Sequence, residues 1–289
     1  MSFTDIVTRS LTINQVPIKV HGISTGMVKV KAKYLNARRK GLLAALAFLF
    51  DKEFSDWAPI WTWVIEHPEG IFLIDTGENA NVNDPGYFKS SGAFSNWLNT
   101  TQFKFKIERD EEIDRQLERV GLSVAKLDRV YLTHLHLDHI DGLRHVKDKP
   151  VWVNKLEWEK PYADLPKLYP EGWEPQLFPM DTSYANFPKA AFLTQDQNLI
   201  ALETPGHTHG QTSFLLKTDQ GEILIAADVV YYQQQLVDDI YSAANVNFKA
   251  AAETYAKLRE YTRQQAVVIL PSHDIEAGTR LEYMEALSW

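Results

Sequence analysis

The stretch Thr133–His139, which reads Thr-His-Leu-His-Leu-Asp-His, constrains this chain more than any other feature. It places three imidazoles and one carboxylate within six residues, directly after an apolar run. His134 and His136 are two positions apart, so in an extended segment their side chains leave the same face and can bind one metal ion. Asp138 and His139 diverge from that pair and can serve a second ion. A solvated polar loop is the alternative, but it does not account for this spacing.

Composition limits the protein classes that the chain can belong to. With 289 residues, of which 45% are hydrophobic, it is long enough for a substantial core. No repeat, low-complexity tract or composition shift marks a boundary, so we expect a single domain over residues 1–289. A net charge of -8 argues against a nucleic-acid partner, because nucleic-acid binders normally carry a basic face. The chain has no cysteine, so any metal must be bound by nitrogen and oxygen donors.

Two segments bear on where the protein acts. Residues 1–20 lack the apolar core of a signal peptide, which predicts a cytoplasmic protein. In the segment 38–50, three basic residues precede about ten apolar ones, which is too short to span a bilayer. We therefore expect no integral membrane segment. Gly41–Phe50 is predicted to be a helix covered by protein, and the alternatives are a homodimer face, the wall of an apolar substrate pocket or a membrane-surface contact.

Apolar runs and turn residues predict the order of the elements. Pro59–Gly77 is predicted to be a hairpin that ends in Asp75-Thr76-Gly77, and Asp110–Val120 a helix that stops at Gly121. We expect a long loop at 78–105 and an irregular, surface-lying segment at 154–198, which holds six of the 13 prolines. Further strands are predicted through Val130 and at 151–153, 199–202, 213–216, 223–227 and 267–270, and a helix at 246–265.

Candidate ligands follow several of these strands. Three apolar runs lead into His134, Asp228 and His273, and His207 follows a fourth run across a Pro-Gly turn. Loops at one edge of a sheet bring side chains from distant parts of the sequence together, so these ligands can meet at one point. With Thr133–His139 they make seven donors, enough for two metal ions that share one carboxylate.

In order along the chain, these motifs resemble the metallo-β-lactamase superfamily. The resemblance rests on His134-x-His136-x-Asp138-His139, Pro205-Gly206-His207-Thr208, Asp228 and His273, and Asp75-Thr76-Gly77 fits as well. It covers roughly 59–273 and implies an α/β (α+β layered) fold, the αββα sandwich of two mixed sheets flanked by helices. One departure is Asp141, where the family commonly has Gly; it concerns the entry to the following helix and not the ligands.

The resemblance also implies a ligand assignment. His134, His136 and His207 would bind one divalent ion, Asp138, His139 and His273 the other, and Asp228 would bridge. The expected cofactors are two divalent metal ions, with Zn²⁺ as the expected metal, and a bridging hydroxide would be the nucleophile. The remaining histidines, His21, His67, His145 and His209, are predicted to be non-ligands, with a contact to a ligand left open for His209.

Several branches of the superfamily fit poorly. The best-known β-lactamases carry Cys where Asp228 stands, and flavin-diiron relatives have Glu at the position of His136. Glyoxalase II enzymes add a helical extension, whereas only 16 residues follow His273. Ribonuclease Z relatives need RNA-binding features that the acidic balance does not supply.

The chain is more similar to the N-acyl homoserine lactone lactonases, which are quorum-quenching enzymes. The 21-residue step from His207 to Asp228 and the 45-residue step from Asp228 to His273 look like that family's. Tyr231 stands three residues after Asp228, where these lactonases place a tyrosine that contacts the substrate carbonyl, although the adjacent Tyr232 is an alternative.

This resemblance implies a hydrolase that opens the lactone ring of a small-molecule substrate with an apolar acyl chain. Tyr231 would stabilise the oxyanion, and Asp138 would deliver a proton to the leaving oxygen. Three alternatives stay open: a phosphotriesterase of the methyl parathion hydrolase type, another lactonase or esterase, and a non-catalytic binding protein on the same fold.

Overall fold

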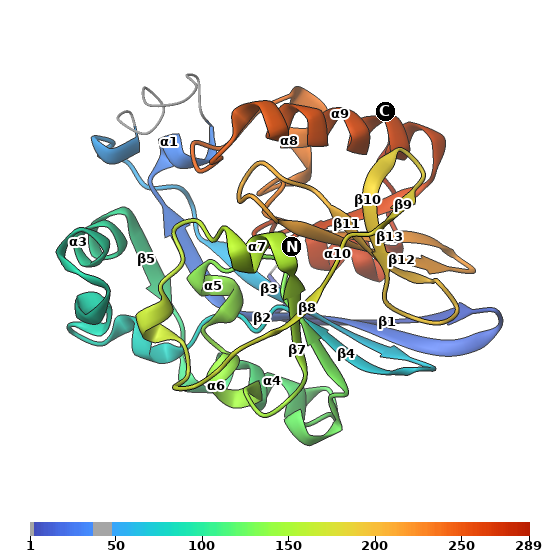
Figure 1. Ribbon diagram of the computed structural model, residues 1–289, viewed down its shortest axis with the longest axis horizontal. Coiled ribbons are helices and arrows are strands. Elements are labelled where there is room, and N and C mark those ends of the chain that lie inside the picture. The colour runs from blue at the N-terminus through green and yellow to red at the C-terminus, as the bar shows by residue number, and fades with distance from the viewer. Residues whose placement is uncertain (1–2, 37–47) are drawn as a thin grey trace.

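The computed structural model describes residues 3–36 and 48–289 and consists of two sheets packed face to face with helices outside (Figure 1). The first sheet runs in the order β1-β2-β3-β4-β6-β7-β8, with β5 paired to β2. Its strands are β1 (Ile6–Ile13), β2 (Val16–Val30), β3 (Ala58–His67), β4 (Gly70–Ile74), β5 (Phe103–Lys106), β6 (Arg129–Tyr131), β7 (Val151–Asn154) and β8 (Gln176–Phe178). The strands β4, β6, β7 and β8 are parallel and the others antiparallel, so the sheet is mixed.

The second sheet is mixed as well. It runs in the order β14-β13-β12-β11-β10-β9, and only the β13–β14 pair is parallel. Its strands are β9 (Thr182–Tyr184), β10 (Phe187–Phe192), β11 (Leu199–Glu203), β12 (Thr212–Thr218), β13 (Gly221–Ala227) and β14 (Val267–Pro271). A buried cluster that includes Trp61, Trp63 and Phe214 fills the space between the two sheets.

Helices cover both outer faces. The α-helices are α1 (Ala32–Leu35), α3 (Ala93–Gln102), α4 (Ile113–Arg119), α5 (Leu137–Ile140), α6 (Leu143–Val146), α7 (Lys155–Glu159), α8 (Gln233–Asp238), α9 (Phe248–Gln264) and α10 (Ala277–Tyr283). Ile113, Leu117 and Ile140 pack on the first sheet, whereas Tyr255 and Leu258 of α9 pack on the second. The layering confirms the expected αββα sandwich.

Most of the sequence-based elements are confirmed. The Pro59–Gly77 hairpin is β3 and β4, which pair antiparallel. The predicted helix at 110–120 is α4, preceded by the short 3-10 helix η3 (Arg109–Glu111), and the helix at 246–265 is α9. The strands expected through Val130 and near 151, 199, 213, 223 and 267 are all present.

Two loop predictions are wrong. Residues 78–105 hold η1 (Ala80–Asn83), η2 (Tyr87–Ser91), α3 and most of β5 instead of one long loop. Residues 154–198 hold α7, η5 (Pro166–Leu168), β8, β9 and β10, so only their middle part is irregular. Much of α3 consists of Ser, Asn and Thr, which have low helix propensity, and prolines interrupt the later segment. Both features predict loops, whereas tertiary packing stabilises helices and strands there.

The predicted helix Gly41–Phe50 falls mostly outside the described residues. Only its last three residues are described, with Phe48 buried and Phe50 exposed. Within the described residues, no helix is long and apolar enough to cross a membrane.

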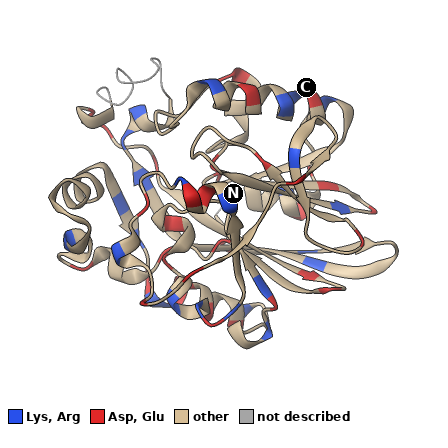
Figure 2. Ribbon diagram, viewed as in Figure 1, with Lys and Arg blue, Asp and Glu red and all other residues tan. Residues whose placement is uncertain are grey.

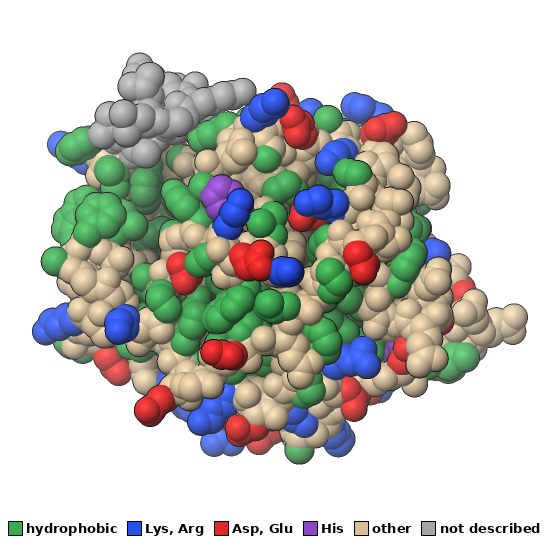
Figure 3. Space-filling model, viewed as in Figure 1, with side chains coloured by type: hydrophobic (Ala, Val, Ile, Leu, Met, Phe, Trp, Pro, Cys, Tyr) green, Lys and Arg blue, Asp and Glu red, His purple; other side chains and the backbone are tan. Residues whose placement is uncertain are grey.

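Charged residues of both signs are scattered over the whole ribbon (Figure 2). Hydrophobic side chains gather on the left of the space-filling view, over α3 (Figure 3), where Phe94 and Trp97 are exposed and face each other at 6.0 Å between ring centroids.

Candidate metal and catalytic site

The seven predicted ligands and Tyr231 converge on one place, at the edge where the strands of both sheets end. The loop after β6 carries His134 and His136, and α5 begins directly after His136, so Asp138 and His139 lie in its first turn. Their ring nitrogens and carboxylate oxygens form three groups of ligand spacing, each with atoms within 4.8 Å of one another: His134, His136 and His207; His134, His139 and Asp228; Asp138, His139 and His273.

The other three ligands, His207, Asp228 and His273, follow strands of the second sheet, and sharp turns precede the first two. Strand β13 ends at Ala227, whose φ of 50° lies in the left-handed region and turns the chain at Asp228. Before His207, Gly206 has a φ of 149°, and a Cβ there would lie 2.6 Å from the Cα of Ala251. Helix α9 therefore approaches the His207 turn so closely that only glycine fits.

For three of the histidines, hydrogen bonds fix which ring nitrogen faces the centre. A carbonyl oxygen only accepts, so the Nδ1–H of His273 donates to the Pro59 carbonyl at 2.9 Å and the Nε2–H of His136 donates to the Tyr162 carbonyl at 3.0 Å. The Nδ1–H of His139 donates to the Asp75 carboxylate at 2.8 Å. Each of these hydrogen bonds occupies one ring nitrogen and leaves the other nitrogen to face the shared centre, which is how metal-binding histidines are oriented.

The atoms that face the centre fit bound metal ions. Nε2 of His134, Nε2 of His139 and Oδ1 of Asp228 are buried and make no hydrogen bond within the described part of the chain. Nε2 of His207 and Nδ1 of His136 face each other at 2.8 Å. Buried polar groups without partners are costly, and a cation among them removes that cost. The donor set of imidazoles and carboxylates suits divalent zinc.

The Asp228 carboxylate faces both groups of histidines. Its Oδ1 lies 3.3 Å from Nε2 of His139 and 3.4 Å from Nε2 of His273, whereas its Oδ2 lies 3.6 Å from Nε2 of His207. On the other side of the centre, Oδ2 of Asp138 lies 3.3 Å from Nε2 of His273. The Asp228 carboxylate therefore lies within about one ligand distance of both groups of histidines.

The pKa values of the histidines divide into two classes. Burial, and then the neighbouring His136, lower the pKa of His207 to about 3, and burial lowers the pKa of His134 well below its usual value. Burial acts in the same direction on His139 and His273, but nearby carboxylates, Asp228 first, overcome it and raise the pKa of His139 well above its usual value and that of His273 to about 10. Without metal, protons on these two rings compensate the carboxylates.

The carboxylates respond in the opposite sense. Burial raises the pKa of Asp138, but His139 and His273 outweigh it and lower the pKa to about 2. They also hold the pKa of Asp228 well below its usual value against the same effect of burial. Both groups are therefore carboxylates at neutral pH, ready to bind cations.

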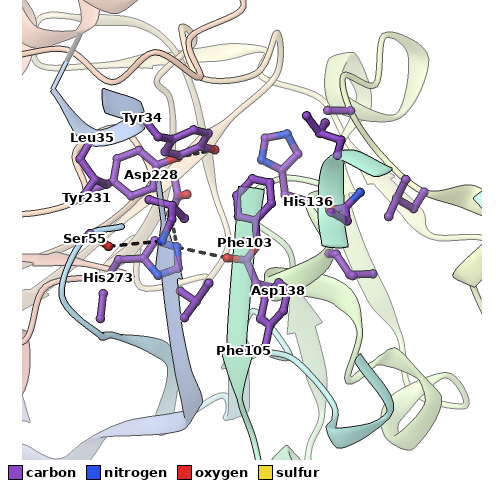
Figure 4. A pocket seen from close by; sticks show the side chains of 18 of the residues that line it. Tyr34, Leu35, Ser55, Phe103, Phe105, His136, Asp138, Asp228, Tyr231 and His273 are labelled. Carbon is purple, nitrogen blue, oxygen red and sulfur yellow. Dashed lines mark hydrogen bonds and ion pairs between the residues drawn. The ribbon is translucent and has the colours of Figure 1, made fainter. Parts of the chain in front are cut away.

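A cavity of about 230 Å³ opens over this centre (Figure 4). His136, Asp138, Asp228, Tyr231 and His273 lie at its polar end. The remaining wall is largely apolar and comes from β2, α3, β5, α5 and the loop after α7: Val28, Val30, Phe94, Leu98, Phe103, Phe105, Leu137 and Leu165.

Of the two candidate tyrosines, Tyr231 lines this cavity. Its ring stacks on His273, with 5.4 Å between centroids, and its hydroxyl bonds that of Tyr34 at 3.1 Å. Burial raises the pKa of the Tyr231 and Tyr34 hydroxyls, so both remain protonated hydrogen-bond donors. Tyr232 instead donates to the side chain of Asn36 at 2.5 Å and does not line the cavity.

Two residues that the sequence analysis did not single out also support the site. The buried Glu157 carboxylate accepts from Leu135 N, Gly210 N and the Thr208 hydroxyl, which ties the two ligand loops together. Tyr34 faces the cavity from the short helix α1. Neither belongs to a ligand motif, so no sequence signal marked them.

Three of the four histidines predicted to be non-ligands lie in other environments. His21 contacts Glu66, His67 contacts Asp196 and His145 contacts Glu112. His67 and His145 each form a group of ligand spacing with two acids, but these acids already have partners. Asp196 pairs with His67, Glu69 accepts from two backbone N–H groups, and Glu112 and Asp114 pair with arginines.

A comparison with protein-family models identifies the family of this chain. Residues 55–273 match the model described as the metallo-beta-lactamase superfamily. The chain belongs to the metallo-β-lactamase superfamily. The match covers all seven convergent ligands and confirms the family expected from their order.

Similar proteins of this superfamily include named lactonases. An N-acyl homoserine lactonase of Bacillus thuringiensis is 27% identical over 224 residues, which are 75% of this chain and 82% of the relative. The N-acyl homoserine lactonase AttM of Agrobacterium fabrum is 23% identical over 235 residues, which are 76% of this chain and 83% of the relative.

Solved structures share the fold. An N-acyl homoserine lactone hydrolase with the product N-hexanoyl-L-homoserine at its catalytic metal center has a TM-score of 0.70 at 20% identity, over 96% of both chains. The hydrolase AbOPH of the beta lactamase superfamily has a TM-score of 0.61 at 16% identity, over 94% of this chain and 91% of that one. Both likenesses confirm the sandwich.

Proposed function

We propose that this protein is a metal-dependent hydrolase that opens the lactone ring of N-acyl homoserine lactones and so quenches quorum signals. The named lactonases among its relatives support the reaction class. The observation that carries the proposal is the cavity, which joins a polar end of metal-ligating side chains to a long apolar wall. A lactone head with a fatty acyl tail has the same division into a polar and an apolar part.

The proposed ligands are those of the three groups of ligand spacing. His134, His136 and His207 would hold one divalent ion, proposed to be zinc, and Asp138, His139 and His273 the second, with Asp228 between them. Such a pair, when bound, supplies an activated water nucleophile and polarises the substrate carbonyl.

The chain's own residues supply the remaining steps. The protonated Tyr231 hydroxyl donates to the carbonyl oxygen as negative charge develops on it. Asp138, a carboxylate on the cavity wall, accepts the proton of the attacking water and passes it to the ring oxygen when the carbon–oxygen bond breaks. The apolar wall holds the acyl chain and keeps water from it.

Steady-state kinetics on three substrate classes test the proposal. The purified protein, with its metal content measured, is given homoserine lactones of increasing acyl length, an organophosphate triester and a glutathione thioester. We expect the highest kcat/KM on the lactones, loss of activity after chelation and recovery with added zinc. The Tyr231→Phe variant should lose about 100-fold in kcat, because one donor to an oxyanion is removed.

A phosphotriesterase is the outcome that would contradict this function. A phosphotriester would present its phosphoryl oxygen to the same polar end of the cavity as the lactone carbonyl. Metal-dependent turnover of the triester without turnover of any lactone would reject the lactonase assignment and leave the metal centre standing.

A further inference from the structure

Tyr34 faces the site from a part of the chain that carries no ligand. It belongs to the one-turn helix α1, which follows β2, and it lines the same cavity as Asp138 and Asp228. Its hydroxyl lies 3.1 Å from that of Tyr231, and the two rings meet edge to face with 5.6 Å between centroids. In Figure 4 both phenol oxygens point toward the space above Asp228.

The surrounding contacts hold the Tyr34 ring in one orientation. Phe103 meets it edge to face at 5.6 Å, and Phe48 packs against it at 5.1 Å, both measured between centroids. Its carbonyl oxygen accepts a hydrogen bond from Ala243 N at 2.7 Å, which fixes α1 to the loop after α8. A side chain restrained this way gives its hydroxyl a defined place over the site.

Counting hydrogens shows what the pair can do. Two phenols carry two hydroxyl hydrogens and share one hydrogen bond, so one hydrogen remains for a ligand in the cavity. In the structure the Tyr231 hydroxyl donates to that of Tyr34. Hydroxyl hydrogens rotate without moving heavy atoms, so with a substrate oxygen in the cavity Tyr231 can donate to that oxygen while Tyr34 donates to Tyr231. A donor that itself accepts a hydrogen bond is polarised and donates more strongly.

We propose that Tyr34 is a positioning residue that holds and polarises the Tyr231 hydroxyl, so that the two tyrosines act as one donor unit toward the carbonyl oxygen of the substrate. The proposal rests on the proposed ester-type hydrolysis but not on the identity of the ester. No bond is made or broken at Tyr34, and only the direction of one hydrogen bond changes during the reaction.

Four variants test the pair: Tyr34→Phe, Tyr231→Phe, the double variant and Tyr232→Phe. Tyr232 is the matched control, because its hydroxyl bonds Asn36 just beyond the same short helix and does not line the cavity. For each variant kcat, KM, bound metal and the thermal midpoint Tm are measured, with N-hexanoyl homoserine lactone as substrate.

We expect Tyr34→Phe to lower kcat about 5- to 10-fold, the range for losing one supporting hydrogen bond. KM, metal content and Tm should stay at wild-type values, and the double variant should be no slower than Tyr231→Phe. Tyr232→Phe should behave as wild type in kcat.

Other outcomes would overturn the proposal. An unchanged kcat in Tyr34→Phe shows that the pair is not a unit, and a fall in Tm or metal content that accounts for the lost rate shows a merely structural role. A further loss in the double variant shows that Tyr34 acts on the substrate independently of Tyr231. If the wild-type protein does not hydrolyse lactones, the lactonase function fails, and the same variants are compared on the ester or triester that it does hydrolyse.

Discussion

Asp75 shows how one residue outside the ligand set fixes a ligand. Its carboxylate accepts from Thr133 N, the Thr133 hydroxyl and Nδ1 of His139, each at 2.8 Å. Its φ of 61° is unusual for a residue other than glycine, so the chain accepts backbone strain at this position. The Nδ1 contact fixes the ring so that Nε2, the atom that faces Asp228, is the nitrogen left for a metal ion.

In Asp75→Asn the amide oxygen should face Thr133 N, which needs an acceptor, so the amide nitrogen faces Nδ1 of His139. An amide nitrogen cannot accept the Nδ1 proton, and metal binding should weaken. The ring then favours the tautomer that carries its proton on Nε2, which cannot bind a metal. We expect zinc affinity, measured by competition with a chromogenic chelator, to fall about 10- to 100-fold. Asp128→Asn is the control, since Asp128 accepts from Ile71 N at the other end of the same strand pair. Equal affinity in the two variants would contradict this role of Asp75.

Asp141, the departure from the family's common glycine, belongs to a buried acidic pair. Its carboxylate accepts from the Tyr87 hydroxyl and the Asn79 amide, which ties the 78–92 segment to α5. Burial, and then the charge of Asp141, raise the pKa of Glu78 well above its usual value. The pair therefore makes the stability of the fold depend on pH.

The direction of that dependence follows from proton counting. Unfolded Glu78 has a pKa of about 4.3, and its folded pKa is higher, so between the two values the folded chain binds more protons than the unfolded chain. Its contribution to stability is then lost as pH rises through this window. Glu78→Gln removes the titration, so urea unfolding of the metal-loaded protein should show an advantage for the variant that grows from about pH 5 to about pH 8. The exposed Glu282→Gln is the control, and an advantage independent of pH would contradict the mechanism.

At the scale of elements, the N-terminus of α9 supports the His207 turn. Asn247 caps the helix by accepting from Lys249 N and Ala250 N, and its own N–H donates to the Gly206 carbonyl at 3.1 Å. Asn247→Ala should lower the free energy of unfolding by about 1 kcal/mol, measured with urea. An unchanged midpoint would show that packing on the second sheet, and not the cap, fixes this end of α9.

Helix α3 and strand β5 form the part of the cavity wall that would meet an acyl chain. Leu98 lies there and is half-buried. Each buried methylene contributes about 0.8 kcal/mol, so Leu98→Asn should lower kcat/KM about 10-fold for decanoyl homoserine lactone and less than about 2-fold for the butanoyl substrate. Thr100→Asn, on an exposed position of the same helix, is the control. Equal losses at both chain lengths would remove α3 from the acyl-binding wall.

The sequence was informative where strands deliver ligands. His134, Asp228 and His273 each follow a short apolar run, and the chemistry of their side chains allowed only a few interpretations. By contrast, α3 could not be predicted, because Ser, Asn and Thr give it weak local propensity and its contacts with β5 and η2 are tertiary. Strand β2, with 15 residues, pairs with three other strands of the first sheet. Its mixture of polar and apolar residues did not predict a strand.

Residues that act through shape were the hardest to foresee. Tyr34 lies about 100 positions before the ligand motif, in a helix of one turn, and Glu157 is one acidic residue among the 38 of the chain. Both residues have their roles because they are buried beside segments that are distant in the sequence, and a local sequence pattern does not predict such contacts. A motif predicts the residues whose side-chain chemistry the site requires. A supporting residue is defined by its position in the fold, which a motif does not give.

For the whole molecule, the proposed metal centre lies where the two halves of the sandwich meet. The first sheet supplies His134, His136, Asp138 and His139, and the loops of the second sheet supply His207, Asp228 and His273. Bound ions would therefore link the two sheets. Without them, the negative charges of the carboxylates are balanced by protons on His139 and His273. Since an unfolded chain does not hold these ligands together, metal binding adds to the stability of the fold.

Removal of metal should lower the thermal midpoint of the whole protein. A ligand at 100 times its dissociation constant raises the free energy of unfolding by about 2.7 kcal/mol, so chelation should lower Tm by more than about 5 °C. Added zinc should restore Tm, and Asp75→Asn should need more zinc for the same recovery. In calorimetry, one unfolding transition should shift as a unit, because the ligands come from both sheets. A Tm that does not change with chelation would show that the sandwich is complete without metal and that the ions contribute to catalysis alone.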